Sequence, residues 1–353
     1  MRKWMDKWML PGAIILGTSL YVIYRFSPAL HPCGPWLHPL ASEGQRLVIA
    51  LLLFFQFVKI SPHDLQFTRW HWKALAVQTG LFLLLAAAVL LVEPGPGRML
   101  LECAMLCFIC PTAAAAGVIT DRLGGNLAAT VSYLVIINVA ATFLIPLVIP
   151  VVNPSAQMGF WTYVGHIAWK VFPILILPAL LAWLIRYTTH KLQRTLMRWA
   201  SNSFYIWGVG LTLAMVLATR ALLLSDLGLW GIAGIVAVSV LCCFLQFFIG
   251  RRIGSAGADS PREGLGSAGA GTSPGGIGLL LAPGEVYAPA EFSQTDSITA
   301  GQTLGQKNTG FLIWLGYNYM TPVTSVAGGL YAIWQNLFNS WELARKARWD
   351  QRG

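Results

Sequence analysis

The sequence predicts an all-α polytopic membrane protein with about ten transmembrane helices. Its 353 residues are 56% hydrophobic and only 11% charged, with a mean hydropathy of +0.61. Soluble domains carry about 25% charged residues, so this composition is typical of a chain that sits in lipid. Apolar runs of about 20 residues recur along the chain, which is the length that crosses a bilayer as a helix. None shows the strict alternation of a membrane-barrel strand, so helices are expected.

The order of these apolar runs gives the expected domain organisation. Their centres lie near Gly17, Leu52, Leu85, Phe108, Asn138, Leu175, Leu211, Gly234, Leu312 and Ala332. We expect transmembrane helices 1–8 within residues 1–253 and helices 9–10 within residues 297–344. Residues 254–296 have the Gly, Ser and Pro content of a disordered cytoplasmic linker, and residues 345–353 form a basic cytoplasmic tail.

The placement of Lys and Arg predicts the orientation in the membrane. Most of the 24 basic residues fall at one set of alternating helix ends, and only Arg25, Arg46, Arg98 and Arg220 fall at the other. Because cytoplasmic loops carry the excess of Lys and Arg, both termini are expected in the cytoplasm, in a plasma membrane such as a bacterial inner membrane. The net charge of +10 then reports topology and contact with lipid headgroups, and no nucleic-acid partner is expected.

Two motif-like patterns are expected to bind no cofactor or metal. A GxGxxG pattern in the linker, at Gly264, Gly266 and Gly269, follows no strand and opens no helix, so it lacks the context of a dinucleotide site. The cysteines of CAMLCFIC, residues 103–110, are spaced to lie on one face of an apolar helix. A radical iron–sulfur cluster needs a polar loop instead, so these thiols are expected to pack in the core.

Two of the apolar segments are interrupted by polar residues, glycine and proline. One reads CPTAAAAGVITDRLGGN from Cys110, in which Pro111 removes a backbone donor. The other reads ITAGQTLGQKNTG before a further apolar run. One interrupted span in each half of about five helices is typical of an inverted-repeat secondary transporter, whose freed backbone groups bind ion and substrate. The alternative is that these residues only kink packed helices.

The same segments resemble a known transporter family. The stretch PTAAAAGVITDRLGGNLAATVSYLVIINVAATFLIPLVIPVV is similar to the fourth and fifth helices of the bile acid:sodium symporter family, and GQKNTGFLIWLGYNYMTPVTSVAGGLYAIWQNLFNS to its ninth and tenth. The resemblance implies two inverted five-helix repeats, a panel domain and a core domain, and broken fourth and ninth helices that cross beside the substrate cavity. It also implies a substrate that is an organic anion, either bile-acid-like or a small carboxylate.

The resemblance also shows where this chain departs from the family's sodium sites. The Ser–Asn pair after the proline of the fourth helix is replaced by Ala116 and Gly117, and a threonine of the fifth helix by Leu134, while Thr130 keeps its hydroxyl. In the ninth helix, Thr303 replaces the acidic residue and Lys307 replaces the glutamine of the GMQN motif. The expected residues at the crossover or the substrate are Pro111, Thr112, Ala116, Gly117, Asn138, Asn308 and Thr309.

Lys307 is therefore the residue on which the predicted function depends. Sodium needs several hard oxygen ligands, and a unit charge about 4 Å away would oppose it by about 4 kcal/mol at an effective dielectric of 20. We expect Lys307 Nζ to take the second sodium position and to bond Gln78 and freed carbonyls, with Thr303 and Thr130 nearby. Transport would then be sodium-independent, either coupled to protons through this lysine or uncoupled.

Other interpretations of the sequence remain open at this stage. Lys307 could snorkel or pair structurally, and the protein could still be a sodium-coupled organic anion symporter. A transporter-like sensor that signals through the 254–296 loop is a further alternative. An enzyme that uses Lys307 as a nucleophile is not favoured, because GQTLGQKNTG offers no His, Asp or Glu as a partner. We therefore expect no enzymatic activity.

Overall fold

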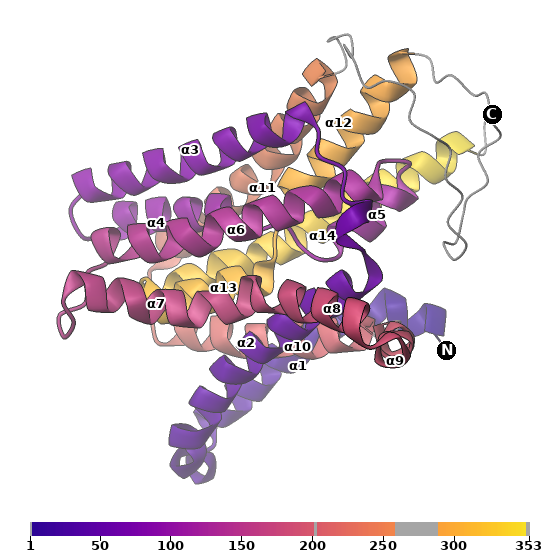
Figure 1. Ribbon diagram of the computed structural model, residues 1–353. Helices are drawn as coiled ribbons and strands as arrows, with labels where there is room; N and C mark the ends of the chain where they lie inside the picture. Colours follow the sequence, from indigo (N-terminus) through magenta and orange to yellow (C-terminus); the bar gives the residue numbers. More distant parts are fainter. Residues whose placement is uncertain (1, 201–202, 258–288, 351–353) are drawn as a thin grey trace.

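The computed structural model describes residues 2–200, 203–257 and 289–350, which fold into a bundle of helices (Figure 1). The helices of the first half are α1 (Arg2–Phe26), α2 (Gly34–Lys59), α3 (Arg69–Leu91), α4 (Pro96–Ile109), α5 (Ala116–Arg122) and α6 (Leu127–Val152). Those of the second half are α7 (Phe160–Leu175), α8 (Leu177–Thr188), α9 (His190–Ala200), α10 (Ser203–Leu223), α11 (Leu229–Gly257), α12 (Pro289–Gly305), α13 (Thr309–Tyr319) and α14 (Ser325–Asp350). Short 3₁₀ turns are η1 (Pro28–Cys33), η2 (Pro62–Asp64) and η3 (Pro322–Thr324).

Fewer helices than predicted are long and apolar enough to cross a bilayer by themselves. Within the described residues, 5 stretches meet that requirement, namely Pro28–Lys59, α3, α6, Tyr205–Leu223 and Leu229–Ala256, and α7 with α8 forms a sixth that is bent by 41°. Part of the difference from about ten has a physical reason. Two of the predicted spans are built from half-helices, α4 with α5 and α12 with α13, and α4, α12 and α13 have only 14, 17 and 11 residues.

The helices form two packing groups. One contains α1, α2, α7, α8, α9 and α10, in which α10 packs against both α1 and α2, and α2 packs against α8. The other contains α3–α6 and α11–α14, with α11 lying along α12 and α14 (Figure 1). Contacts of α7 with α6, and of α10 with α13 and α14, join the groups. In Figure 1, α1 begins and α14 ends toward the same end of the bundle.

The ends of the predicted linker are helical instead of irregular. Helix α11 continues to Gly257 and α12 begins at Pro289, so only residues 258–288 lie between them, outside the described residues together with the GxGxxG pattern. The cause is close helix packing. A Cβ on Gly250 or Gly254 would overlap the backbone carbonyl of Ala300 or Asp296 on α12. Small residues spaced four apart let two membrane helices approach closely, and this keeps both helices regular beyond the predicted boundary.

The predicted basic tail is also mostly helical. Helix α14 extends to Asp350, so the described part of the 345–353 segment continues the last helix, and residues 351–353 lie outside the described residues.

The predicted core packing of the cysteines is confirmed. Cys103, Cys107 and Cys110 of α4 and its end, and Cys242 and Cys243 of α11, are all buried and belong to the main hydrophobic cluster. Most neighbouring positions in α4 and α11 are apolar, so the thiols act as small packing groups between these helices. Their burial brings α4 and α11 together directly beside the breaks in the two half-helix pairs.

Candidate functional site: the contact between the two broken helices

The two predicted breaks exist and contact each other. Helix α4 ends at Ile109 and α5 begins at Ala116, while α12 ends at Gly305 and α13 begins at Thr309. Thr112 and Lys307 form an isolated antiparallel β-bridge. The N–H of Ala113 donates to the carbonyl of Gln306 at 2.9 Å, and the N–H of Asn308 donates to the carbonyl of Pro111 at 2.8 Å. Backbone groups that a helix would have used are therefore satisfied across the crossover, as lipid requires.

Local side chains hold the breaks in place. The Asn308 side chain accepts from the N–H of Phe311 at 3.2 Å and so caps α13, and Thr309 is its first residue. On the other strand of the bridge, the Thr112 hydroxyl donates to the carbonyl of Thr303 at 2.8 Å. Pro111 contributes its carbonyl and lacks an N–H, which suits a position where α4 must stop. Pro111, Thr112, Asn308 and Thr309 thus lie at the contact between the two breaks.

Lys307 is completely buried at this point. Its exposed fraction is 0%, and its backbone N–H donates to Gln335 Oε1 at 2.9 Å. Within the described residues, its Nζ has no hydrogen-bond partner. The ionisable groups that interact with it electrostatically are the thiols of Cys110, Cys107 and Cys243. An unpaired ammonium among buried apolar groups is one of the most unfavourable placements available to a side chain.

The predicted bond between Lys307 and Gln78 is wrong. The Gln78 amide donates to the carbonyl of Cys110 at 3.2 Å, and its Oε1 accepts from the Tyr133 hydroxyl at 2.9 Å. Both ends of the Gln78 side chain are therefore already used. Gln78 supports the break after α4 from the side of α3, instead of binding the ammonium.

The two threonines predicted beside the ion position contact each other. The Thr303 hydroxyl donates to the Thr130 hydroxyl at 3.4 Å, and Thr130 in turn donates to the carbonyl of Asn126 at 3.0 Å. Both side chains are fully buried. The hydroxyl protons of both residues are thus used in hydrogen bonds within the protein.

The remaining predicted residues divide into two groups. Ala116 and Gly117 open α5 and are buried, and a Cβ on Gly117 would lie 2.6 Å from Leu127 Cδ1, so a small residue lets α5 pack on α6. Asn138 does not join the crossover hydrogen bonds. Its amide donates to the carbonyl of Leu175 at 3.4 Å, where α7 ends and the chain bends into α8. Asn138 therefore links α6 to α7.

Three residues that the sequence did not single out as site residues complete the surroundings of the break. Gln335 binds the backbone of Lys307, and the Tyr331 hydroxyl donates to the carbonyl of Gly305 at 2.8 Å. The Gln246 amide donates to the carbonyl of Cys107 at 3.2 Å and to the Tyr331 hydroxyl at 3.1 Å. A polar side chain within an apolar run, as in FLQFFIG, was the available signal for Gln246.

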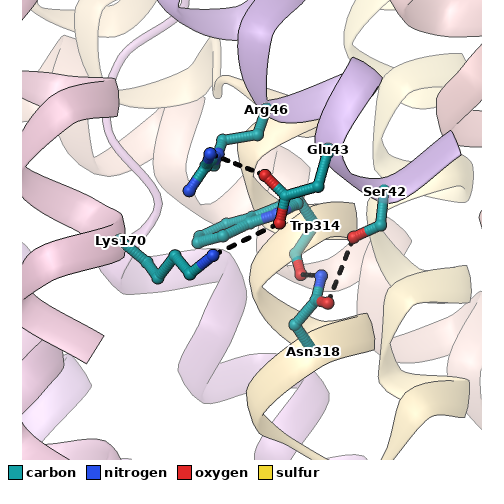
Figure 2. Close-up of polar contacts among 6 residues, drawn as sticks. All are labelled: Ser42, Glu43, Arg46, Lys170, Trp314 and Asn318. Atoms are coloured by element: carbon teal, nitrogen blue, oxygen red, sulfur yellow. Dashed lines mark hydrogen bonds and ion pairs between the residues drawn. The ribbon is translucent and has the colours of Figure 1, made fainter. Parts of the chain in front are cut away.

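A second polar cluster joins the two packing groups (Figure 2). Glu43 of α2 lies between two cations, with Arg46 Nη2 at 2.6 Å and Lys170 Nζ of α7 at 3.4 Å. Beside it, the Ser42 hydroxyl donates to Asn318 Oδ1 at 3.1 Å, and the Asn318 amide donates to the carbonyl of Trp314 in α13 at 2.7 Å. Three ionisable side chains in membrane helices point to a functional role, and they carry a net positive charge.

Comparison with protein families identifies the chain. The SBF-like CPA transporter family matches residues 14–308, a range that contains both breaks and ends one residue after Lys307. The chain belongs to the SBF-like CPA transporter family. No curated protein matches it. Membership in the SBF-like CPA transporter family confirms the resemblance to bile acid:sodium symporters that the sequence motifs indicated.

The SBF-like CPA transporter family gives the coarse function. Its members are transporters and not enzymes, so the protein acts in a lipid bilayer on a small-molecule substrate. The several apolar helices agree with a multi-pass membrane protein. At the crossover, the side chains of Lys307, Thr130 and Thr303 are all fully buried.

Proposed function

We propose that this protein is a secondary-active or facilitative transporter of an organic anion, independent of sodium, in which the Lys307 ammonium takes the role of a bound cation. The observation that carries the proposal is the position of Lys307, fully buried on the β-bridge between the two broken helices. The substrate class follows from the family resemblance and from the positive charge at both polar sites. A bile-acid-like anion and a small carboxylate both fit.

The chemistry of the crossover argues against a sodium ion. Thr130 and Thr303 bond each other, and Ala116 and Gly117 offer no side-chain oxygen. Sodium requires a cage of several hard oxygen ligands, preferably including a carboxylate. At about 4 Å and an effective dielectric of 20, the ammonium would oppose a second positive charge by about 4 kcal/mol, which is nearly three orders of magnitude in affinity.

The unpartnered Nζ suggests how Lys307 could drive a transport cycle. A buried charge without a partner must be offset by an anion, reached by water, or removed by loss of its proton. An anionic substrate that binds at this point would offset the charge. Release of a proton to one side of the membrane would remove it. In either case the charge or the pairing of Lys307 differs between the substrate-bound and the substrate-free protein. Binding and release of a coupled cation would produce the same kind of change.

The arrangement of the helices supports an inverted-repeat architecture. Among the described elements, α1, α2, α3, α4–α5 and α6 are followed by α7–α8, α10, α11, α12–α13 and α14, with a broken pair fourth in each set. Helix α2 packs against α7 and α8 much as α10 packs against α1, and α3 packs against α4 as α11 packs against α12. In this proposal both termini lie on the same side of a plasma membrane, because α1 begins and α14 ends toward the same end of the bundle (Figure 1). The excess of Lys and Arg on that side makes it the cytoplasmic side.

Transport in proteoliposomes tests the proposal. Uptake of radiolabelled cholate and pantoate would be measured with sodium, with choline and with an imposed pH gradient. We expect equal uptake in sodium and choline. Acceleration by an acidic exterior, lost in Lys307→Gln, indicates proton coupling, whereas no effect of pH indicates facilitated transport or exchange. Uptake that strictly needs sodium overturns the proposal.

A second measurement needs no substrate. Ligands that bind only the folded state raise its stability, and a sodium site with a Kd of about 10 mM would add about 1.8 kcal/mol in 200 mM salt. We therefore expect the same thermal midpoint in sodium chloride and in choline chloride at equal ionic strength. A midpoint that rises only with sodium contradicts sodium independence.

A further inference from the structure

Helices α11, α12 and α14 line a basic cavity at the end of the bundle where α14 finishes. The cavity has a volume of about 380 Å³, and its lining includes three basic side chains, one acid and two tryptophans: Arg251, Arg345, Lys346, Glu342, Trp341 and Trp349. Basic cavities between transmembrane helices are typical sites for acidic lipid headgroups. Tryptophan is enriched at the same level of the bilayer, the boundary between headgroups and acyl chains.

A second cavity extends the first along the membrane-facing side of the same helices. It has a volume of about 370 Å³ and shares Arg251, Trp341 and Arg345 with the first, but its other lining residues are Phe244, Phe247, Phe248 and Phe338. Phe244 and Phe248 remain 45% and 56% exposed, as expected for side chains that contact acyl chains. The two cavities therefore offer a basic end and an apolar aromatic trough to one amphipathic molecule.

The charges at the basic end are unevenly balanced. Glu342 is buried and accepts from both Arg251 and Gln302, so its carboxylate is already used within the protein. The Arg345 guanidinium lies over the Trp341 ring at 5.6 Å, which orients it at the mouth of the cavity. One carboxylate among three basic side chains leaves a net positive charge, which is complementary to a phosphate.

We propose that this double cavity binds one phospholipid with an anionic headgroup. Arg345 and Lys346 contact the phosphate, and one acyl chain lies along Phe244, Phe248 and Phe338. A soluble anion would use only the basic end, and a neutral lipid only the trough. An anionic phospholipid supplies both chemistries and is already concentrated in the bilayer around the protein.

Hydrogen bonds connect this site to the crossover. Glu342 accepts from the Gln302 amide, and Gln302 Oε1 accepts from the Gln306 amide. Gln306 is part of the break, where its carbonyl accepts from the N–H of Ala113. A lipid headgroup that holds Arg345 and Lys346 would therefore stabilise the end of α14 from which this chain of contacts starts.

Native mass spectrometry of the full-length protein tests the proposal with dioleoyl phosphatidylglycerol and dioleoyl phosphatidylcholine. We expect one phosphatidylglycerol to bind at least tenfold more tightly than phosphatidylcholine. The double variant Arg345→Gln/Lys346→Gln should remove that preference. Arg348→Gln is the matched control, because Arg348 is an exposed arginine on the same helix, its side chain donates to the carbonyl of Ala344, and it does not line either cavity.

Further measurements distinguish lipid binding from the binding of other ligands, and a loss of binding from misfolding. Phe248→Ser alters an exposed side chain in the trough and should weaken phosphatidylglycerol binding several-fold while the thermal midpoint stays within a few degrees. If the double variant does not fold, Arg345→Gln alone is expected to lower the preference. Equal binding of the two lipids, an unchanged preference in a folded arginine or lysine variant, or displacement of the lipid by millimolar inorganic phosphate overturns the proposal.

Discussion

Asn308 donates its backbone N–H to the carbonyl oxygen of Pro111 at 2.8 Å. This bond joins two helix breaks that lie far apart in the sequence. Together with the bond from Ala113 to Gln306 it forms the isolated antiparallel bridge between Thr112 and Lys307. Lys307 lies between these bonds, so its backbone position is held rigidly although its Nζ has no hydrogen-bond partner among the described residues. A rigid backbone that carries an amine without a hydrogen-bond partner suits a group whose protonation state changes during transport.

Lys307→Met should separate stability from function. Methionine has a similar length without the charge, and a buried polar group that lacks a partner is unfavourable, so its replacement by an apolar side chain should not destabilise the protein. We expect a thermal midpoint that is unchanged or higher, together with loss of cholate or pantoate uptake. Thermal unfolding followed by tryptophan fluorescence and uptake in proteoliposomes measure the two effects.

Lys73→Met is the control for that experiment, because Lys73 is an exposed lysine of α3. It should leave both quantities unchanged. A Lys307→Met protein that is much less stable but still transports would assign this lysine a structural role.

Gly250→Ala should destabilise the protein through the contact between α11 and α12. An added Cβ would overlap the carbonyl oxygen of Ala300, which is backbone and cannot turn aside. Overpacking of this kind costs about 1–3 kcal/mol. The same substitution at Gly80 in α3 is the matched control, because no atom lies within 4 Å of its added Cβ. There alanine should be neutral or raise stability by up to about 1 kcal/mol. Equal thermal midpoints for the two variants would refute the close approach of α11 and α12.

Glu43→Gln should change transport more than stability. The Glu43 side chain is 46% exposed, and ion pairs in such positions contribute about 0.2–1 kcal/mol. The thermal midpoint should therefore shift by only a few degrees. Without the carboxylate, Arg46 and Lys170 are free to attract an anion, so the KM for an anionic substrate should fall several-fold.

Glu93→Gln, which alters an exposed carboxylate between α3 and α4, is the comparison for Glu43 and should leave the KM unchanged. An unaltered KM in Glu43→Gln would remove the cluster in Figure 2 from the substrate path.

Cys33 should be the cysteine that reacts with a thiol reagent in the folded protein. Of the 6 cysteines, Cys33 in η1 is exposed and the other five are buried. We expect about one maleimide per chain, abolished by Cys33→Ser, because reaction requires an accessible thiolate. A membrane-impermeant maleimide added to intact cells also reports orientation. Labelling from outside agrees with a cytoplasmic N-terminus, whereas labelling only after the cells are opened would reverse the proposed topology.

Local sequence patterns predicted the breaks because they act within a few residues. Pro111 lacks a donor wherever it stands, and polar residues with glycine around Lys307 disfavour a continuous apolar helix. The four-then-three spacing of Cys103, Cys107 and Cys110 likewise identifies one helix face without any tertiary information. The ends of α11 and α12 were misplaced for the complementary reason. The helical conformation at these ends depends on the fit of Gly250 and Gly254 against α12. The composition of the segment, taken alone, indicates a flexible linker.

By itself, the sequence determined that this is a helical membrane protein of a transporter family, with a lysine in a polar, glycine-containing interruption of an apolar segment. Only the tertiary structure decided which groups meet. It placed Gln78 on Cys110 and Tyr133 instead of on Lys307 Nζ, and Glu43 between Arg46 and Lys170. The physical reason is the distance along the chain over which each interaction acts. Backbone preference and helical periodicity are set by neighbours in the chain, whereas side-chain hydrogen bonds depend on how distant helices pack.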